Sequence, residues 1–143
     1  MSNRAIWQQL VANGGIHAQP GAILDQECLP KRSSFDFGRV EGMLLGLAIG
    51  DALGAPTESR QPAAREAEWG QIRDYVPNRH TGLALGYPSD DTQLSYWALG
   101  QLILDGHLDP ENLAASLAQG RIFGIGASVR RFLANRQAGL PWH

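Results

Sequence analysis

Glycine recurs at every fourth position of one apolar segment, and no other feature constrains the fold of this chain as strongly. The four glycines are Gly42, Gly46, Gly50 and Gly54. Apolar residues between them repeat with helical spacing, at Val40, Met43, Leu44, Leu47 and Ala48. A glycine inside a helix costs roughly 1 kcal/mol relative to alanine, so several in one helix make sense where another backbone packs closely against them. The segment therefore predicts a buried central helix.

The length and charge of the chain exclude several classes of protein. Its 143 residues are close to the roughly 150 that make up one domain. The 12 Lys and Arg against 14 Asp and Glu give a net charge of −2, and no segment concentrates the basic residues. We therefore expect neither nucleic acid nor an anionic membrane as a partner.

The remaining composition favours a cytoplasmic protein. Cys28 is the only cysteine, which excludes an intrachain disulfide and a cysteine-based zinc site. The longest apolar run, residues 43–50, is far shorter than the roughly 20 residues that span a bilayer. The N-terminal residues include no continuous apolar stretch of the kind found in secretory signals. We expect no transmembrane helix and a cytoplasmic location.

Helical patterns and turn residues divide the chain into segments. Residues 1–38 carry many helix-breaking residues and at most one helix, around residues 5–12, so they are expected to form an N-terminal extension. Further helices are predicted near residues 39–54, 63–69, 90–104, 110–119 and 128–136. The helix at 90–104 has a narrow polar face, which predicts burial along most of its length. No segment shows convincing strand alternation, so the expected fold class is all-α.

Three oxygen-bearing side chains stand where the helix at 90–104 begins, namely Ser89, Asp90 and Asp91. One interpretation is an N-cap serine followed by two acids that favour the helix dipole. The other is a divalent cation site, because adjacent carboxylates repel each other and here precede an almost wholly apolar helix. Mg²⁺ prefers a few carboxylate and hydroxyl oxygens together with waters, and this cluster offers that set.

Another acid, Glu58, follows the glycine-spaced helix and lies near the start of the long connection over residues 55–88. By itself it is most simply a solvated loop carboxylate. Its position after the segment Gly50 to Thr57 suggests a functional role instead, because that segment and the Ser89 cluster together resemble two motifs of one protein family.

The two segments, residues 39–58 and residues 89–93, resemble the motifs of the ADP-ribosylglycohydrolase family in order and spacing. The resemblance covers roughly residues 39–143. It implies an all-α fold with two Mg²⁺ ions in a cleft. It also implies hydrolysis of the N- or O-glycosidic bond between ADP-ribose and an amino-acid side chain.

The resemblance implies a role for each matching residue. Ser89, Asp90 and Asp91 correspond to the first metal-ligand group, where the family more often has Thr at the first place. Glu58 corresponds to an acid with a catalytic or gating role. A glycine-rich turn ahead of the last helix corresponds to a cradle for the ADP-ribose phosphates, with Gly124, Gly126, Ala127 and Ser128 as its residues. Backbone N–H groups at a helix start suit phosphate, although a plain interhelical turn has the same pattern.

The sequence departs from the family pattern in its length. The family's second half carries an Asn-Gly-Ala-Met-Arg-like segment and an Asp-x-Asp-Thr-like motif that completes the metal pair, and neither occurs here. Residues 39–143 are therefore expected to be the N-terminal part of such a domain. Half of a two-metal site is expected to bind metal poorly.

Two functions follow as expectations. The first is a Mg²⁺-dependent hydrolase that removes ADP-ribose from modified protein side chains. The second is a non-enzymatic binding or immunity-type protein that recognises an ADP-ribosylating enzyme, or its ADP-ribosylated product, through residues 1–38. The ligand cluster favours the enzyme, whereas the extension and the absent second-half motifs favour the binder.

Overall fold

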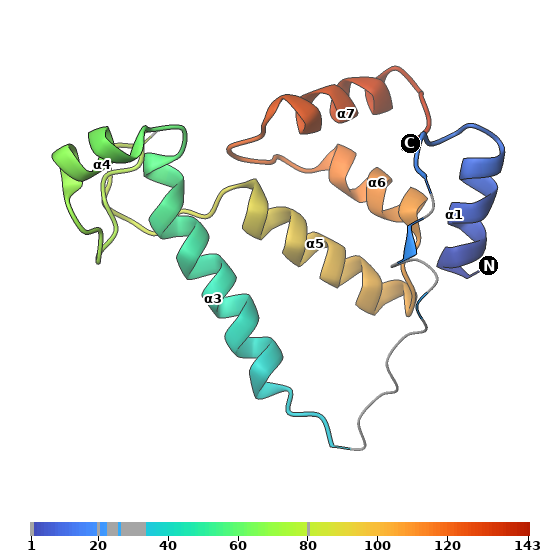
Figure 1. The fold of residues 1–143 in the computed structure, drawn as a ribbon, viewed down its shortest axis with the longest axis horizontal. Coiled ribbons are helices and arrows are strands. Elements are labelled where there is room, and N and C mark those ends of the chain that lie inside the picture. Colours follow the sequence, from blue (N-terminus) through green and yellow to red (C-terminus); the bar gives the residue numbers. More distant parts are fainter. Residues whose placement is uncertain (1, 20, 23–25, 27–33, 80) are drawn as a thin grey trace.

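The computed structural model describes residues 2–19, 21–22, 26, 34–79 and 81–143 (Figure 1). Cys28 and part of the expected N-terminal extension lie outside these residues. The elements are α1 (Asn3–Ala12), α3 (Gly38–Gly54), the 3-10 helix η1 (Ala55–Thr57), α4 (Pro62–Trp69), α5 (Asp90–Asp105), α6 (Pro110–Gln119) and α7 (Ala127–Gln137). The described residues contain no strand, which confirms the all-α fold class.

The helices are arranged around α5. Helix α5 packs against α3 on one side and α6 on the other, and α6 in turn packs against α7. Figure 1 shows α3 and α5 diverging from a junction between the end of α3 and the start of α5. Helix α4 lies beyond this junction, while α1 lies at the opposite side of the molecule, near the C-terminal residues. The junction therefore joins segments that are far apart in the sequence.

Local capping explains where the predicted helices begin and end. The side chain of Ser89 accepts a hydrogen bond from the Asp91 N–H at the start of α5. Asp109 accepts from the N–H groups of Glu111 and Asn112 at the start of α6. Gly106 closes α5 in the left-handed conformation, with φ of 68°, which favours glycine. These helix bounds agree with the sequence predictions to within a few residues.

The prediction that α3 is a buried central helix is wrong. Only Ala52 is buried in this helix, whereas Met43, Leu45 and Ile49 are 63%, 60% and 50% exposed. A Cβ atom added at any of the four regularly spaced glycines would meet no atom within 4 Å. The reason is that, among the described elements, α3 packs chiefly against α5 and η1, so its glycine face has no neighbouring backbone.

The predicted burial of α5 holds only near its start. Thr92 is the buried residue of this helix, while Ile103 and Leu104 at its other end are 71% and 81% exposed. No helix in the described part of the chain is long and apolar enough to cross a membrane.

Apart from Ala114 on α6, the buried residues in the described part of the chain gather at the junction of α3, η1 and α5. They are Ala52, Pro56, Thr57, Ser89 and Thr92. Three of these are polar, which is unusual for the most buried part of a protein, because a buried polar group is costly unless it is hydrogen-bonded. The burial of these three polar residues therefore depends on the hydrogen bonds at this junction.

Candidate functional site

The carboxylate of Asp51, in the last turn of α3, joins α3 to the first turn of α5. Its Oδ1 accepts a hydrogen bond from Ser89 Oγ at 2.6 Å, and its Oδ2 accepts from Ser89 N at 2.7 Å. The same Oδ2 accepts from Thr92 N at 3.2 Å and Thr92 Oγ1 at 2.5 Å. Asp51 thus satisfies both buried hydroxyls and two backbone N–H groups at the start of α5.

The environment of Asp51 favours its charged form. Partial burial raises the pKa of its carboxyl, but the hydrogen bonds donated by Ser89 and Thr92 together outweigh burial and hold that pKa below its usual value. The candidate residues chosen from the sequence did not include Asp51. It lies inside the first motif, but its partners are 38 and 41 residues away, and no local pattern indicates that contact.

The proposed metal ligands lie directly beside this junction. Ser89 is 9% exposed, and its hydroxyl both donates to Asp51 and accepts from the Asp91 N–H at 3.4 Å. Asp90 is half-buried and Asp91 is exposed. The capping interpretation of Ser89 is confirmed by this geometry. The metal-ligand role of the three residues stays a prediction.

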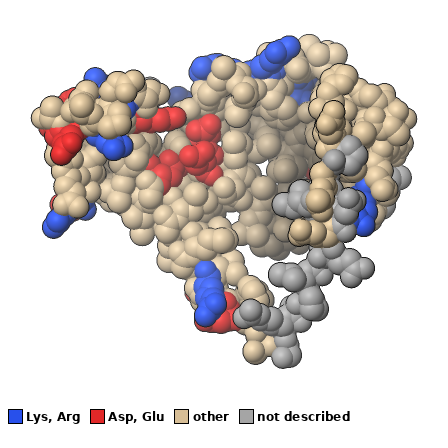
Figure 2. Space-filling view, viewed as in Figure 1, with Lys and Arg blue, Asp and Glu red and all other residues tan. Residues whose placement is uncertain are grey.

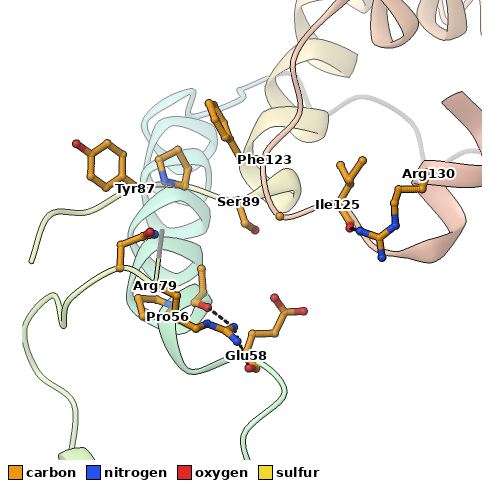
Figure 3. A pocket seen from close by; sticks show the side chains of 12 residues that line it. Pro56, Glu58, Arg79, Tyr87, Ser89, Phe123, Ile125 and Arg130 are labelled. Atoms are coloured by element: carbon orange, nitrogen blue, oxygen red, sulfur yellow. Dashed lines mark hydrogen bonds between the residues drawn. The ribbon is translucent and has the colours of Figure 1, made fainter. Parts of the chain in front are cut away.

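A cavity of about 400 Å³ opens next to Ser89 (Figure 3). Its walls come from η1, the loop before α5, the turn before α7 and α7 itself. The residues that line it are Ala55, Pro56, Glu58, Asn78, Arg79, Tyr87, Pro88, Ser89, Phe123, Gly124, Ile125 and Arg130. The candidate catalytic residue Glu58 is exposed on its wall.

A second cavity, of about 460 Å³, adjoins the first through Glu58 and Ser89, which line both. It is also lined by the acids Asp51 and Asp91 and by the arginines Arg60 and Arg65. Figure 2 shows acidic side chains gathered where the end of α3 meets the start of α5. Glu58 and Asp91, one candidate acid from each motif, therefore line the same cavity, whereas Asp90 lines neither cavity.

Two side chains fix the loops that form the first cavity. Arg79 Nη2 donates to the carbonyl oxygens of Ala55 at 3.3 Å and Glu58 at 3.0 Å. Gln93 Nε2 donates to the carbonyl of Arg121 at 3.2 Å, and its Oε1 accepts from the N–H of Phe123 at 2.7 Å. Each side chain bonds two backbone groups of a remote loop, so the cavity walls are held by specific contacts.

The glycine-rich turn reaches the cavity through Gly124. This residue has φ of +73°, and a Cβ atom added to it would lie 3.1 Å from Ser89 Cβ and 3.4 Å from Asp90 Oδ1. Both features favour glycine at this position. Gly126 caps α7, and Ala127 and Ser128 form its first turn, but these three residues do not line the cavity. The phosphate-binding role of the turn stays a prediction.

The donor set near Ser89 suits Mg²⁺ better than a metal that takes all of its ligands from protein side chains. In the described part of the chain, no three or more His, Cys, Asp or Glu side chains are grouped so that they could hold a metal ion together. Mg²⁺ is commonly held by one or two carboxylates and keeps several waters. Asp90 and Asp91, with the hydroxyl oxygen of Ser89, provide such a set.

Comparison with known proteins identifies the family of this chain. The family model described as ADP-ribosylglycohydrolase matches residues 32–143. A protein of Archaeoglobus fulgidus is 31% identical over 103 residues, which cover 69% of this chain and 34% of that protein. The ADP-ribosylarginine hydrolase Tri1 of Pseudomonas putida is 32% identical over 115 residues, which cover 73% of this chain and 30% of that protein. The chain spans about a third of the length of these curated relatives. Because the family model covers most of its residues, the chain belongs to the ADP-ribosylglycohydrolase family.

Proposed function

We propose that this chain carries part of the active site of a Mg²⁺-dependent hydrolase that removes ADP-ribose from modified protein side chains. The observation that carries the proposal is the meeting of Glu58, Ser89 and Gly124 on one cavity, although they come from three separate segments. Family membership supports hydrolysis of an ADP-ribose linkage. The name of the Pseudomonas putida relative makes ADP-ribosylated arginine the first substrate to test.

The first turn of α5 holds the metal in this proposal, through Ser89, Asp90 and Asp91. Mg²⁺, when bound, supplies Lewis-acid polarisation of the glycosidic linkage and its leaving group. The carboxylates provide the negative charge that a small divalent cation requires. The assignment is supported by Ser89, which lines both cavities, and by Asp91, which lines the second. Asp90 lies near the first cavity, because a Cβ atom added at Gly124 on its wall would be 3.4 Å from Asp90 Oδ1.

Glu58 acts on the attacking water in this proposal. Its exposed carboxylate forms part of the wall shared by the two cavities, and Arg79 holds the carbonyl group of the same residue. The hydrogen bond from Arg79 fixes the backbone of Glu58 and leaves its carboxylate exposed, so the carboxylate can accept a hydrogen bond from a water and orient the lone pair of that water toward the reacting carbon. As the water oxygen bonds to the ribose carbon, the C–N or C–O bond to the side chain breaks, and the proton that the water loses passes to the leaving side chain.

The phosphates of ADP-ribose are proposed to lie toward the turn that begins at Gly124. No side chain caps the N-terminus of α7 and its first turn contains no acidic residue, so the N–H groups of Ala127 and Ser128 are available to an anion. The guanidinium of Arg130, whose Nη1 donates to the carbonyl of Ile125 at 2.7 Å, stiffens the turn and adds positive charge nearby.

The experiment that tests this function measures ADP-ribose release from an ADP-ribosylated arginine peptide by the protein expressed from its complete reading frame. Release is expected with Mg²⁺ and not with EDTA. Glu58→Gln is expected to lower kcat by about 100-fold or more. The control is Glu68→Gln on α4, which lines neither cavity and is expected to change kcat less than twofold. Equal rates for the two variants contradict the role of Glu58.

A second candidate function is binding without turnover through residues 1–38. Helix α1 lies outside the family match, and its half-buried side chains include Ile6, Trp7 and Leu10. The turn after α1 contacts the C-terminal residues, since the carbonyl of Gly15 lies 2.9 Å from Nδ1 of His143. If this function is correct, the protein binds an ADP-ribosylated target in EDTA, and Trp7→Ala abolishes that binding.

A further inference from the structure

The hydrogen bonds at the α3–α5 junction fix the direction of two hydroxyl groups. An ionised carboxylate can only accept hydrogen bonds. The hydroxyl protons of Ser89 and Thr92 therefore both point at Asp51, whose carboxylate oxygens lie 2.6 Å from Ser89 Oγ and 2.5 Å from Thr92 Oγ1. The lone pairs of Ser89 Oγ consequently face away from Asp51, toward the side where Asp91 donates its N–H.

Water cannot easily replace Asp51 as the hydrogen-bond acceptor of these two hydroxyls. Ser89 and Thr92 are 9% and 8% exposed, and an unsatisfied buried donor is costly. Without the carboxylate, the hydroxyl of Ser89 would turn its proton toward another acceptor, and the nearest strong acceptors in sequence are the carboxylates of Asp90 and Asp91. A proton in that direction repels a cation and occupies the carboxylates that would bind it.

The contacts of Asp51 also fix the backbone that carries these carboxylates. Asp51 accepts from the N–H groups of Ser89 and Thr92, which lie on either side of Asp90 and Asp91. The end of α3 therefore sets the direction in which the first turn of α5 presents both acids.

We propose that Asp51 is a positioning residue for a divalent cation site. By accepting the hydrogen bonds of Ser89 and Thr92, it turns a lone pair of Ser89 Oγ toward the cation. It also holds the first turn of α5 so that Asp90 and Asp91 face the cation. This inference rests on the proposed function, in which those three residues bind the metal. Asp51 itself is not one of the proposed metal ligands. Its effect is transmitted through Ser89 and the first turn of α5.

The test measures the affinity for Mn²⁺ alone, by electron paramagnetic resonance, in the protein expressed from its complete reading frame. Asp51→Asn is close to isosteric but replaces one acceptor oxygen by an amide donor. Thr92→Val removes one hydroxyl donor without changing shape, and Thr92→Ser keeps that donor. Asp105→Asn is the matched control, because Asp105 also accepts two side-chain amide hydrogen bonds, from Gln101 and Asn112, but at the far end of α5.

Asp51→Asn is expected to raise the dissociation constant for Mn²⁺ by about tenfold or more. Thr92→Val removes one of the four hydrogen bonds and is expected to raise the dissociation constant by a smaller factor. Thr92→Ser, which keeps the hydroxyl, is expected to leave the dissociation constant at its natural value. Asp105→Asn stays within twofold of the natural protein. A purely structural role for Asp51 predicts a lower melting temperature with an unchanged dissociation constant well below that temperature, and that result overturns the proposal.

Hydrogen–deuterium exchange separates this proposal from the function on which it rests. If the natural protein binds no Mn²⁺, the metal assignment fails, and exchange at the first turn of α5 then decides the role of Asp51. Faster exchange in peptides covering residues 88–93 for Asp51→Asn, but not for Asp105→Asn, supports the positioning role. Equal exchange in the two variants contradicts it.

Discussion

At the scale of single residues, the site depends on side chains that bond across long stretches of sequence. Asp51 joins α3 to α5, and Gln93 joins α5 to the turn before α7. Neither contact is indicated by a local pattern, because residue spacing within one helix says nothing about which loop lies beside it. The candidate residues Glu58, Ser89, Asp90 and Asp91, in contrast, were found through two motifs, each of which is contiguous in sequence.

A comparison of two glycines in one turn tests the close approach of that turn to α5. Gly124→Ala places a Cβ atom 3.1 Å from Ser89 Cβ and does so at φ of +73°, so we expect a loss of about 1–3 kcal/mol in the free energy of unfolding. Gly126→Ala is the control, since its Cβ would meet nothing within 4 Å and its φ of −74° suits alanine. Denaturant unfolding that shows equal stabilities for the two variants would mean that the turn does not contact Ser89.

At the scale of secondary structure, helix bounds were predictable and helix burial was not. Capping residues such as Ser89 and Asp109 act within one turn, so a single sequence contains the information that places a helix start. Burial depends instead on what packs against a face. The glycine and apolar spacing of α3 predicts an interface, but the described elements place neighbours mainly near its C-terminal end.

The exposed glycine face of α3 leads to a prediction opposite to the one that burial would give. In chain 1–143, Gly46→Ala adds a methyl group in open space and improves helix propensity, so the free energy of unfolding is expected to rise by roughly 0.5–1 kcal/mol. A thermal or denaturant melt in which Gly46→Ala is destabilised by that amount would show that another backbone does approach this face in solution.

At the scale of the whole molecule, chain 1–143 is open. It exposes 10834 Å², compared with about 7,200 Å² for a compact protein of this length. Large apolar side chains contribute to this surface on α3 and at the end of α5, including Met43, Leu45, Ile49, Ile103 and Leu104. Exposed apolar surface on this scale is typical of a protein that packs against another protein surface.

This exposure predicts the behaviour of chain 1–143 on its own. We expect it to self-associate, so light scattering after size-exclusion chromatography should give a mass well above that of one chain at micromolar concentration. The metal donors proposed for it are only a hydroxyl and two carboxylates at the start of one helix, so we also expect no ADP-ribose release from a modified arginine peptide in Mg²⁺. A monodisperse monomer with Mg²⁺-dependent turnover contradicts both expectations.

The central claim is that Asp90 and Asp91 bind the metal on which ADP-ribose release depends. The most direct test is the rate of release from an ADP-ribosylated arginine peptide by the protein from its complete reading frame, with Asp90→Asn and Asp91→Asn introduced together. Asparagine keeps the size of each side chain but removes the charge that Mg²⁺ requires, so the rate is expected to fall by about 100-fold or more with little change in melting temperature. An unchanged rate in the double variant contradicts the claim.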